Sequence, residues 1–269
     1  MDLDLKDKVY LVTGGASGIG EAISELLVKE GANVVVIGRN EVKGKEVVAR
    51  LNADRKSAPF AAHYINAELS EDEECRKVVD QSVEVYGRID GLVNNAGKND
   101  GIGLREGSTA AFMQSLKNNL SHYYAMAHYS LPYLIKSKGN IVNISSKTAI
   151  TGQGGTSAYA AAKGAQLALT REWAVELIEE GIRVNAIIPA EVWTPLYEGW
   201  INTFPNPEEK VNSINERIPL GKRMTTSEEI ANAALFLLSN KASHITGQHW
   251  VIDGGYVHLD RVIGTLKKH

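Results

Sequence analysis

The chain has 269 residues, of which 43% are hydrophobic and 23% are charged, and its formal net charge is −3. These proportions are typical of a soluble globular protein, and the small net charge makes nucleic acid and membranes poor candidates as partners. The longest apolar runs, such as Val34–Ile37 and Ile141–Ile144, are too short to cross a bilayer. Because Met1–Lys8 has no apolar stretch and Cys75 is the only cysteine, we expect no signal peptide, no disulfide within the chain and a cytoplasmic location.

Short apolar runs alternate with helical patterns along the chain. Seven runs are predicted to be strands: Val9–Val12, Val34–Ile37, Ala62–Ile65, Gly91–Val93, Asn140–Ile144, Arg183–Ile188 and His249–Ile252. A first helix is predicted between Gly20 and Gly31, and further helices at Lys43–Leu51, Asp72–Tyr86, Phe112–Ile135, Ser157–Glu179 and Glu228–Leu238. This alternation predicts βαβ units, so we expect one α/β domain over residues 1–269 with a doubly wound, seven-stranded parallel sheet and helices on both faces.

One long segment, Ala190–Arg223, interrupts this rhythm after the sixth predicted strand. It carries four of the seven prolines and several aromatic residues, and we expect it to be irregular. Ligands of open α/β sheets lie beyond the carboxyl ends of the strands, so an insert at this place is expected to cover the substrate.

Three glycines, Gly14, Gly18 and Gly20, lie between the first predicted strand and the first predicted helix. Glycine at such a turn lets the backbone approach a pyrophosphate, whose charge is stabilised by the helix N-terminus. The spacing is G-x-x-x-G-x-G, and a turn that merely packs closely would also use glycine. The position at the start of a βα series favours a Rossmann-type dinucleotide site.

The second predicted strand ends at Gly38, and Arg39 follows it. An acidic residue there would bind the adenosine ribose hydroxyls, whereas an arginine can pair with a 2′-phosphate. Arg39 therefore favours NADP. Ser17 in the glycine loop is not basic, and Arg39 could simply face solvent, so NAD stays open.

Tyr159 and Lys163 are four residues apart on a predicted helix and thus share one face. Ser146 lies thirteen residues before Tyr159, at the carboxyl end of a predicted strand. Removing a proton from an alcohol while hydride leaves needs a base active near neutral pH, but a free tyrosine has a pKa of about 10. A nearby ammonium, together with the charge of a nicotinamide, can lower that pKa. Ser146 can hold the substrate oxygen, and no metal is expected because the seven histidines show no close ligand pairing.

With these features the sequence resembles the short-chain dehydrogenase/reductase family over essentially its whole length. The resemblance rests on Thr13-Gly14-x-x-x-Gly18-x-Gly20, Asn94-Asn95-Ala96-Gly97, Asn119, Ser146, Tyr159-x-x-x-Lys163 and Arg183-Val184-Asn185-Ala186-Ile187-x-Pro189. It implies that Asn119, Ser146, Tyr159 and Lys163 are catalytic, that Asn119 holds a water in a proton relay with Lys163, and that the protein is a homo-oligomer, most commonly a tetramer. It also implies cofactor contacts from Gly14, Ser17, Gly18, Ile19, Gly20, Arg39, Glu68, Leu69, Asn95, Ala96, Gly97, Tyr159, Lys163, Pro189, Val192 and Thr194.

Two positions depart from the family pattern. Ala190 stands where the family has glycine after Pro189, and Glu68 stands where it usually has aspartate. The first departure makes the start of the insert less free to move, and the second bears on adenine binding.

Polar residues occur at positions that line the family's substrate pocket: Asn99, Asp100, Ser146, Lys147, Gln153, Tyr159 and Glu191, with Trp193 beside them. Singly, each polar loop residue would be expected to face solvent, but together they favour a pocket for several hydroxyl groups with an aromatic platform for a sugar ring. The surrounding segments are similar to the branch that contains L-fucose dehydrogenases, which implies oxidation of the anomeric carbon of L-fucose or a related aldose to a lactone. The alternatives are a 3-oxoacyl-thioester or other carbonyl reductase and, in another class, a non-catalytic nucleotide-sensing module.

Overall fold

The computed structural model describes residues 2–53 and 61–259, so Met1 and the last ten residues of the predicted 1–269 domain lie outside the described residues. It contains a seven-stranded sheet in the order β3-β2-β1-β4-β5-β6-β9, with every neighbouring pair parallel. The strands are β1 Val9–Thr13, β2 Asn33–Gly38, β3 Ala62–Asn66, β4 Gly91–Asn94, β5 Asn140–Ile144, β6 Arg183–Pro189 and β9 His249–Ile252. The predicted doubly wound, seven-stranded parallel sheet is confirmed.

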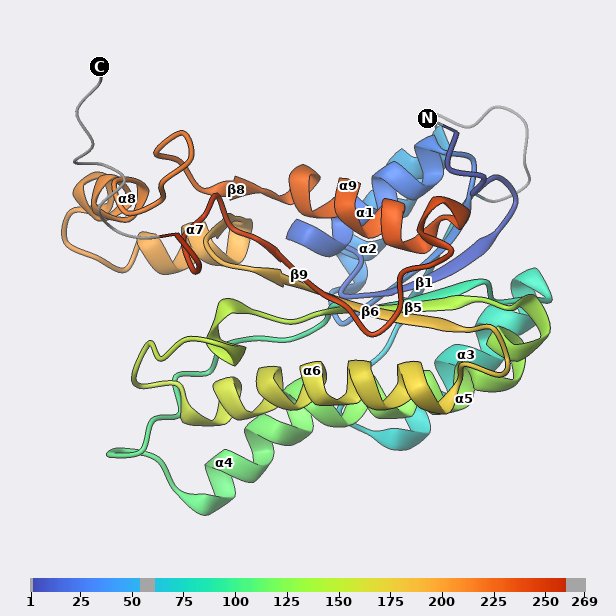
Figure 1. The fold of residues 1–269 in the computed structure, drawn as a ribbon, viewed down its shortest axis with the longest axis horizontal. Helices are drawn as coiled ribbons and strands as arrows, with labels where there is room; N and C mark the ends of the chain where they lie inside the picture. Colours follow the sequence, from blue (N-terminus) through green and yellow to red (C-terminus); the bar gives the residue numbers. More distant parts are fainter. Residues whose placement is uncertain (1, 54–60, 260–269) are drawn as a thin grey trace.

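Helices cover both faces of this sheet (Figure 1). On one face lie α1 Gly18–Lys29, α2 Glu41–Ala53 and α9 Ser227–Leu238; on the other lie α3 Asp72–Tyr86, α5 His122–Ser137 and α6 Ser157–Glu176. Val34, Val35 and Val36 in β2 are fully buried because helices pack on both sides of them. This double burial explains why the strands are continuous apolar runs rather than alternating ones.

The chain reverses its direction of travel across the sheet between β1 and β4. β2 and β3 are added on one side of β1, and β4, β5, β6 and β9 on the other. Loops leaving neighbouring strands at such a reversal diverge, which opens a crevice at the carboxyl ends. Asn95, just after β4, is hydrogen-bonded to Thr13, the last residue of β1. Its backbone N–H donates to Thr13 Oγ1 at 2.8 Å, and its side-chain amide donates to the Thr13 carbonyl at 2.9 Å.

The helical stretch predicted near Phe112–Ile135 is confirmed, but it is not one regular α-helix. The segment begins with α4, Thr109–Leu116, continues through a π-helical turn, η1, Lys117–Ser121, and then becomes α5. A π turn keeps the helical path but adds a residue to it, so the apolar pattern does not reveal it. The neighbouring helix α6 ends at Glu176, three residues before the predicted end.

The insert is more regular than expected. It contains β7 Val192–Trp193, α7 Pro195–Ile201 and α8 Pro207–Asn215, and β7 pairs with β8 Thr225–Thr226 just beyond it. Thr194 and Asn206 cap these helices with their side chains, and a proline follows each cap at the first helical position. Proline is favourable there because its missing N–H needs no partner. In Figure 1 both helices lie at one end of the molecule, beyond the carboxyl ends of the strands.

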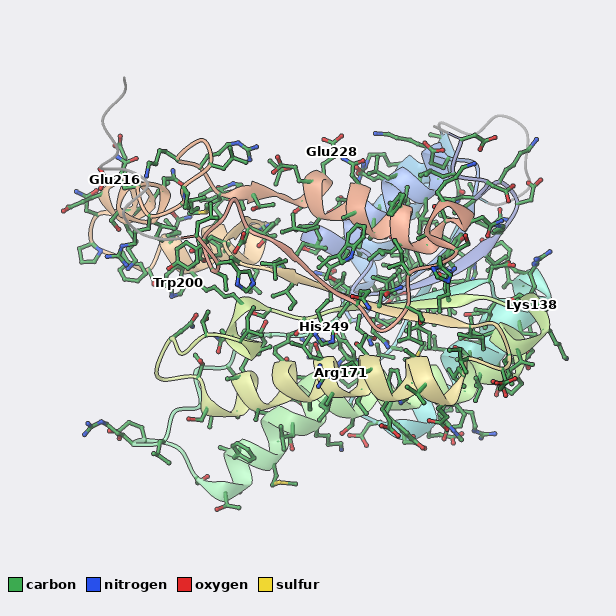
Figure 2. The ribbon with its side chains drawn as sticks, viewed as in Figure 1. Lys138, Arg171, Trp200, Glu216, Glu228 and His249 are labelled. Atoms are coloured by element: carbon green, nitrogen blue, oxygen red, sulfur yellow. The ribbon has the colours of Figure 1, made fainter. Side chains whose placement is uncertain are left out.

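Figure 2 locates the two ends of the sheet. Lys138, just before β5, lies at one end, and Trp200 of α7 and Glu216, just after α8, lie at the other. Across the residues that the structure describes, no helix is both long enough and apolar enough to span a membrane.

Candidate active site

A cavity of about 920 Å³ occupies the carboxyl ends of the strands. Most of the predicted site residues line it: Gly14, Ser17, Gly18, Ile19, Arg39, Glu68, Leu69, Asn95, Ala96, Gly97, Asn99, Asp100, Asn119, Ser146, Tyr159, Lys163, Pro189, Val192 and Thr194. Five predicted residues do not line it: Gly20, Lys147, Gln153, Glu191 and Trp193. A cavity of this volume is large enough for an extended ligand with a second small molecule beside it.

The glycine turn at one end of the cavity has the geometry that a bound anion requires. Gly14 and Gly18 have φ values of +65° and +55°, which other residues rarely adopt. A Cβ on Gly20 would lie 2.2 Å from the carbonyl oxygen of Gly14, so Gly20 permits the close packing of the turn without lining the cavity. Ser17, the N-cap of α1, makes no side-chain capping bond, so the first N–H groups of α1 lack that partner and can bind a phosphate group.

Two positively charged side chains, Arg39 and Lys43, lie beside the glycine turn. The sequence predicts a cofactor contact for Arg39 but not for Lys43. Arg39 donates to Glu68 at 3.0 Å, and both side chains are at least half exposed. Lys43, in the first turn of α2, donates to Ser17 Oγ at 3.3 Å and lies 3.8 Å from a carboxylate oxygen of Glu21. A second, shallower hollow is lined by Ser17, Arg39 and Lys43 among others. Lys43 comes four residues after Arg39, and this spacing was the available signal.

Tyr159 and Lys163 lie on the cavity-facing side of α6, and the Lys163 ammonium is 5.5 Å from the centre of the Tyr159 ring. Burial raises the pKa of Tyr159 to about 12, against which a hydrogen bond with Ser146 lowers it. Burial also lowers the pKa of Lys163 to about 7. For both groups desolvation is the largest cause of the shift, and it opposes the lowering of the Tyr159 pKa that we expected from Lys163.

The two serines that follow β5 have different partners. Ser145 is buried and donates to the backbone carbonyl of Lys163 at 2.9 Å, which ties β5 to α6. Ser146 lines the cavity, and its Oγ accepts a hydrogen bond from the Thr148 N–H at 3.3 Å. The hydroxyl proton of Ser145 is thus used within the fold, whereas the Ser146 hydroxyl hydrogen-bonds Tyr159, so the geometry favours Ser146, rather than Ser145, as the group that contacts substrate.

The ammonium of Lys163 is held by three acceptors under the floor of the cavity. It donates to the Ile144 carbonyl at 2.8 Å, to Gln166 Oε1 at 3.2 Å and to the Tyr123 hydroxyl at 3.4 Å. Gln166, whose side chain is fully buried, was not expected to belong to the site. Its position three residues after Lys163 on one helix face was the signal that could have found it.

Asn119 lies in the π-helical turn and holds two segments in place. Its Oδ1 accepts from the Lys98 N–H at 2.8 Å, in the loop after β4, and its Nδ2 donates to the Ser115 carbonyl at 3.1 Å. Its backbone carbonyl accepts from Gln166 Nε2 at 2.8 Å. The structure therefore links Asn119 to Lys163 through the amide side chain of Gln166.

The polar residues predicted to bind substrate divide into two groups. Asn99 and Asp100 line the cavity. Lys147 and Glu191 instead form an ion pair in which both side chains are largely buried. The Tyr197 hydroxyl donates to the other carboxylate oxygen of Glu191 at 2.7 Å, and burial with the adjacent carboxylate raises the pKa of Tyr197 far above its ordinary value.

Gln153 is exposed, and Trp193 is 42% exposed and contacts the Tyr197 ring at 6.4 Å between centroids. Lys147, Gln153, Glu191 and Trp193 thus lie outside the lining of the cavity, and a contact of these residues with substrate stays a prediction. Lys147 and Glu191 are brought together by the tertiary fold, and a sequence cannot show that pairing. Among the residues that the structure describes, no group of three or more His, Cys, Asp or Glu side chains could hold a metal ion.

Several known proteins are similar to this chain. A family model described as enoyl-(acyl carrier protein) reductase matches residues 14–257. L-fucose dehydrogenase of Bos taurus is 36% identical over 249 residues, 92% of this chain and 88% of that protein. The 3-oxoacyl-(acyl-carrier-protein) reductase FabG of Thermotoga maritima is 37% identical over 254 residues, 94% of this chain and 99% of that protein.

Solved structures agree over nearly the whole fold. The crystal structure of Cj0485 dehydrogenase has a TM-score of 0.91 at 49% identity and covers 97% of this chain and 98% of its own. The aldohexose dehydrogenase of Thermoplasma acidophilum has a TM-score of 0.85 at 30% identity, with the same coverage. The family to which these similarities point consists of oxidoreductases that use NAD or NADP. With its parallel sheet, glycine turn and Tyr159–Lys163 helix, this chain is a dehydrogenase/reductase that belongs to the short-chain dehydrogenase/reductase family.

Proposed function

We propose that the enzyme oxidises the anomeric carbon of L-fucose or a related aldose to a lactone and transfers the hydride to NADP or NAD, with Tyr159 as the base. The observation that carries this proposal is the convergence of Ser146, Tyr159 and Lys163 on the cavity at the carboxyl ends of the strands. In the proposed reaction Ser146 holds the substrate hydroxyl and Tyr159 accepts its proton. The nicotinamide supplies the hydride acceptor.

The glycine turn and its surroundings fit a dinucleotide. The N–H groups at the start of α1 and the close-packed turn of Gly14 and Gly20 suit a pyrophosphate. Arg39 and Lys43 flank Ser17 and together could bind a 2′-phosphate, so we propose a preference for NADP. Glu68 opposes this preference because its carboxylate already occupies Arg39.

A sugar is favoured over an aliphatic substrate by the polar groups of the cavity and its cover. Asn99 and Asp100 can bind hydroxyl groups directly. Trp193 of the insert offers an aromatic face near the cavity. The similarity to an L-fucose dehydrogenase and to an aldohexose dehydrogenase supports the same class of substrate. The similarity to a 3-oxoacyl thioester reductase supports the second candidate, reduction of a thioester-bound ketone.

The first test is an initial-rate assay at 340 nm with aldoses, polyols and 3-oxoacyl thioesters, each with NAD and NADP. We expect turnover of L-fucose or its stereochemical relatives. Turnover of the thioesters alone would overturn the sugar proposal and support the second candidate.

In the same assay we expect Arg39→Ala and Lys43→Ala to raise the KM for NADP about tenfold and the KM for NAD less than twofold, because each removes a charge from the phosphate site. Lys45→Ala, which removes an exposed lysine paired with Glu41 on the same helix, is the matched control.

We also propose a homo-oligomer, most simply a tetramer. Apolar side chains lie on the outside of the molecule along α5 and α6: Tyr124 of α5, Val175 of α6 and Ile178, just after α6, are each more than half exposed. An outer layer of apolar residues on adjacent helices suits burial against a second copy. Sedimentation at micromolar concentration is the test, and a monomer would contradict the proposal.

A further inference from the structure

The ammonium of Lys163 has three N–H donors, and the protein supplies three acceptors for them. The Ile144 carbonyl is fixed by β5, and the Tyr123 hydroxyl is fixed by its own donation to that same carbonyl at 2.9 Å. Gln166 Oε1 is the third acceptor, at 3.2 Å. A lysine side chain is long and flexible, so its charge stays in one place only where several acceptors hold it.

The orientation of the Gln166 amide is set by its two partners. An ammonium can only donate, so the side-chain oxygen of Gln166 must face Lys163, and a backbone carbonyl can only accept, so the nitrogen must face Asn119. The amide thus forms a bridge from α6 to the π-helical turn. Because Gln166 is fully buried, water does not compete for these two bonds.

We propose that Gln166 is a positioning residue for catalysis: its amide bridge to the Asn119 carbonyl fixes the ammonium of Lys163 beneath Tyr159. The inference rests on the proposed action of Tyr159 and Lys163. Where a bound water in this place would be mobile, the amide is held by the helix backbone. Oε1 also favours the charged form of Lys163, which burial disfavours. A charged Lys163 in turn stabilises the phenolate of Tyr159, the form that accepts the substrate proton.

The pH dependence of the reaction can report on this bridge because the other groups facing Lys163 do not titrate near neutral pH. His122 of α5 is buried, which lowers its pKa to about 4, and burial raises the pKa of Tyr123 well above its usual value. On α6 itself Tyr159 faces Lys163, and Asp100 acts on Tyr159 from the loop after β4. The acidic limb of the oxidation rate therefore belongs to the coupled Tyr159 and Lys163 pair.

Two substitutions separate positioning from packing. Gln166→Met keeps the volume but removes the acceptor, so Lys163 loses its proton more easily and the phenolate is less stabilised. We expect the acidic limb of kcat/KM for oxidation to move up by about one pH unit, with rates about tenfold lower below the limb. Gln166→Ala opens a space lined by polar groups, in which a water can bridge Lys163 and Asn119. We expect its limb to stay within about 0.3 units of the wild type.

The thermal stability of the two variants should follow the opposite order from their kcat/KM: the variant that is less active should be the more stable one. A volume-conserving change costs less than a cavity, so Gln166→Met should have a higher Tm than Gln166→Ala. If Gln166 only packs, the less stable Ala variant will be the less active one and neither limb will move, which would overturn the inference. Leu167→Ala, a cavity at the next residue of α6, is the control for lost packing without loss of the bridge.

The enzyme is assayed as the full chain with whichever alcohol the substrate panel identifies, and cofactor binding is measured by fluorescence titration. If Gln166→Met does not fold, Gln166→Leu, which is also apolar and has a similar volume to methionine, takes its place. Tyr159→Phe distinguishes the two levels of failure. Full activity of that variant would overturn the proposed mechanism, whereas an inactive Tyr159→Phe with an unmoved limb in Gln166→Met would overturn only this inference.

Discussion

The floor and the cover of the cavity are built in different ways. The floor, formed by β5, η1, α5 and α6, consists of buried polar residues that bond one another: Asn119, Lys163 and Gln166 are each no more than 3% exposed. The cover, formed by the insert, carries Trp193, Leu196 and Trp200 with 42%, 58% and 45% of their surface exposed. A buried network tolerates few substitutions, whereas an exposed one tolerates many. The floor therefore suits the shared chemistry of the family, and the cover suits the choice of substrate.

The relatives carry names that refer to different substrates. Proteins whose names refer to L-fucose, to an aldohexose and to a 3-oxoacyl thioester are all 30% to 37% identical to this chain, and they share its length and family. The differences in substrate that their names describe occur on a common framework. Substitutions in the floor and in the cover should accordingly change different kinetic constants.

The largest effect is expected from the floor. Tyr159→Phe removes the proposed base but keeps the ring, so kcat should fall by about a thousandfold, within the range that general acid–base groups contribute. Cofactor affinity, measured by fluorescence titration, should change less than about threefold because the phenol ring and the helix stay in place. A variant that retained even a tenth of the wild-type kcat would show that another group takes the proton.

A smaller effect is expected where the cover meets the floor. Glu191→Gln neutralises the carboxylate that binds both Lys147 and Tyr197, so α7 is held less firmly over the cavity. We expect the KM for the sugar to rise about tenfold while kcat changes less than about threefold, since only positioning is lost. Glu198→Gln, an exposed change on the same helix, should leave both constants unchanged. If kcat fell equally in Glu191→Gln and in the control Glu198→Gln, the assignment of Glu191 to the cover would be contradicted.

The smallest effect is expected at the point where the insert rejoins the sheet. Arg223 hydrogen-bonds Glu229 at 2.6 Å and lowers its pKa to about 2, with help from the Thr226 N–H. Since this pKa lies below the ordinary value of 4.5, the stabilisation is complete above about pH 4.5 and is lost as the pH falls toward 2. Glu229→Gln should lower Tm by about 2 °C at pH 7, with the difference shrinking below pH 4.5.

Glu228→Gln is the control for that measurement. It removes a charge from the same first turn of α9 without touching Arg223 or the capping box between Thr226 and Glu229. Its Tm should change less than that of Glu229→Gln in a calorimetric scan at pH 7. A Tm difference for Glu229→Gln that did not depend on pH would mean that the ionised carboxylate is not the source of the stabilisation.

Much of the floor was predictable from the sequence because periodic patterns report on helices and strands. The seven strands and the placement of Ser146, Tyr159 and Lys163 followed from apolar runs and from i, i+4 spacing. The Gln166 bridge did not, because a buried glutamine looks the same in a sequence as an exposed one. The π-helical turn at Lys117–Ser121 also escaped, because helical spacing continues on both sides of it.

The cover was predicted less well, for physical reasons. Its prolines predict an irregular chain, whereas Thr194 before Pro195 and Asn206 before Pro207 are in fact the capping pattern with which short helices begin. The ion pair of Lys147 and Glu191 joins residues 44 positions apart. Such a contact depends on the tertiary fold, and each partner alone has the composition of a solvent-facing loop residue.

The π-helical turn also constrains how this segment can change in length. Such a turn is an α-helix with one residue inserted, and each residue turns the helix by about 100°. Deleting any one residue of Lys117–Ser121 would restore a regular helix and rotate either Asn119 or the whole of α5 away from its present partners. Tyr123, a fully buried acceptor for Lys163, and the Asn119 carbonyl could not then both keep their places. Insertions and deletions should therefore accumulate in the loops on either side and be absent from these five positions.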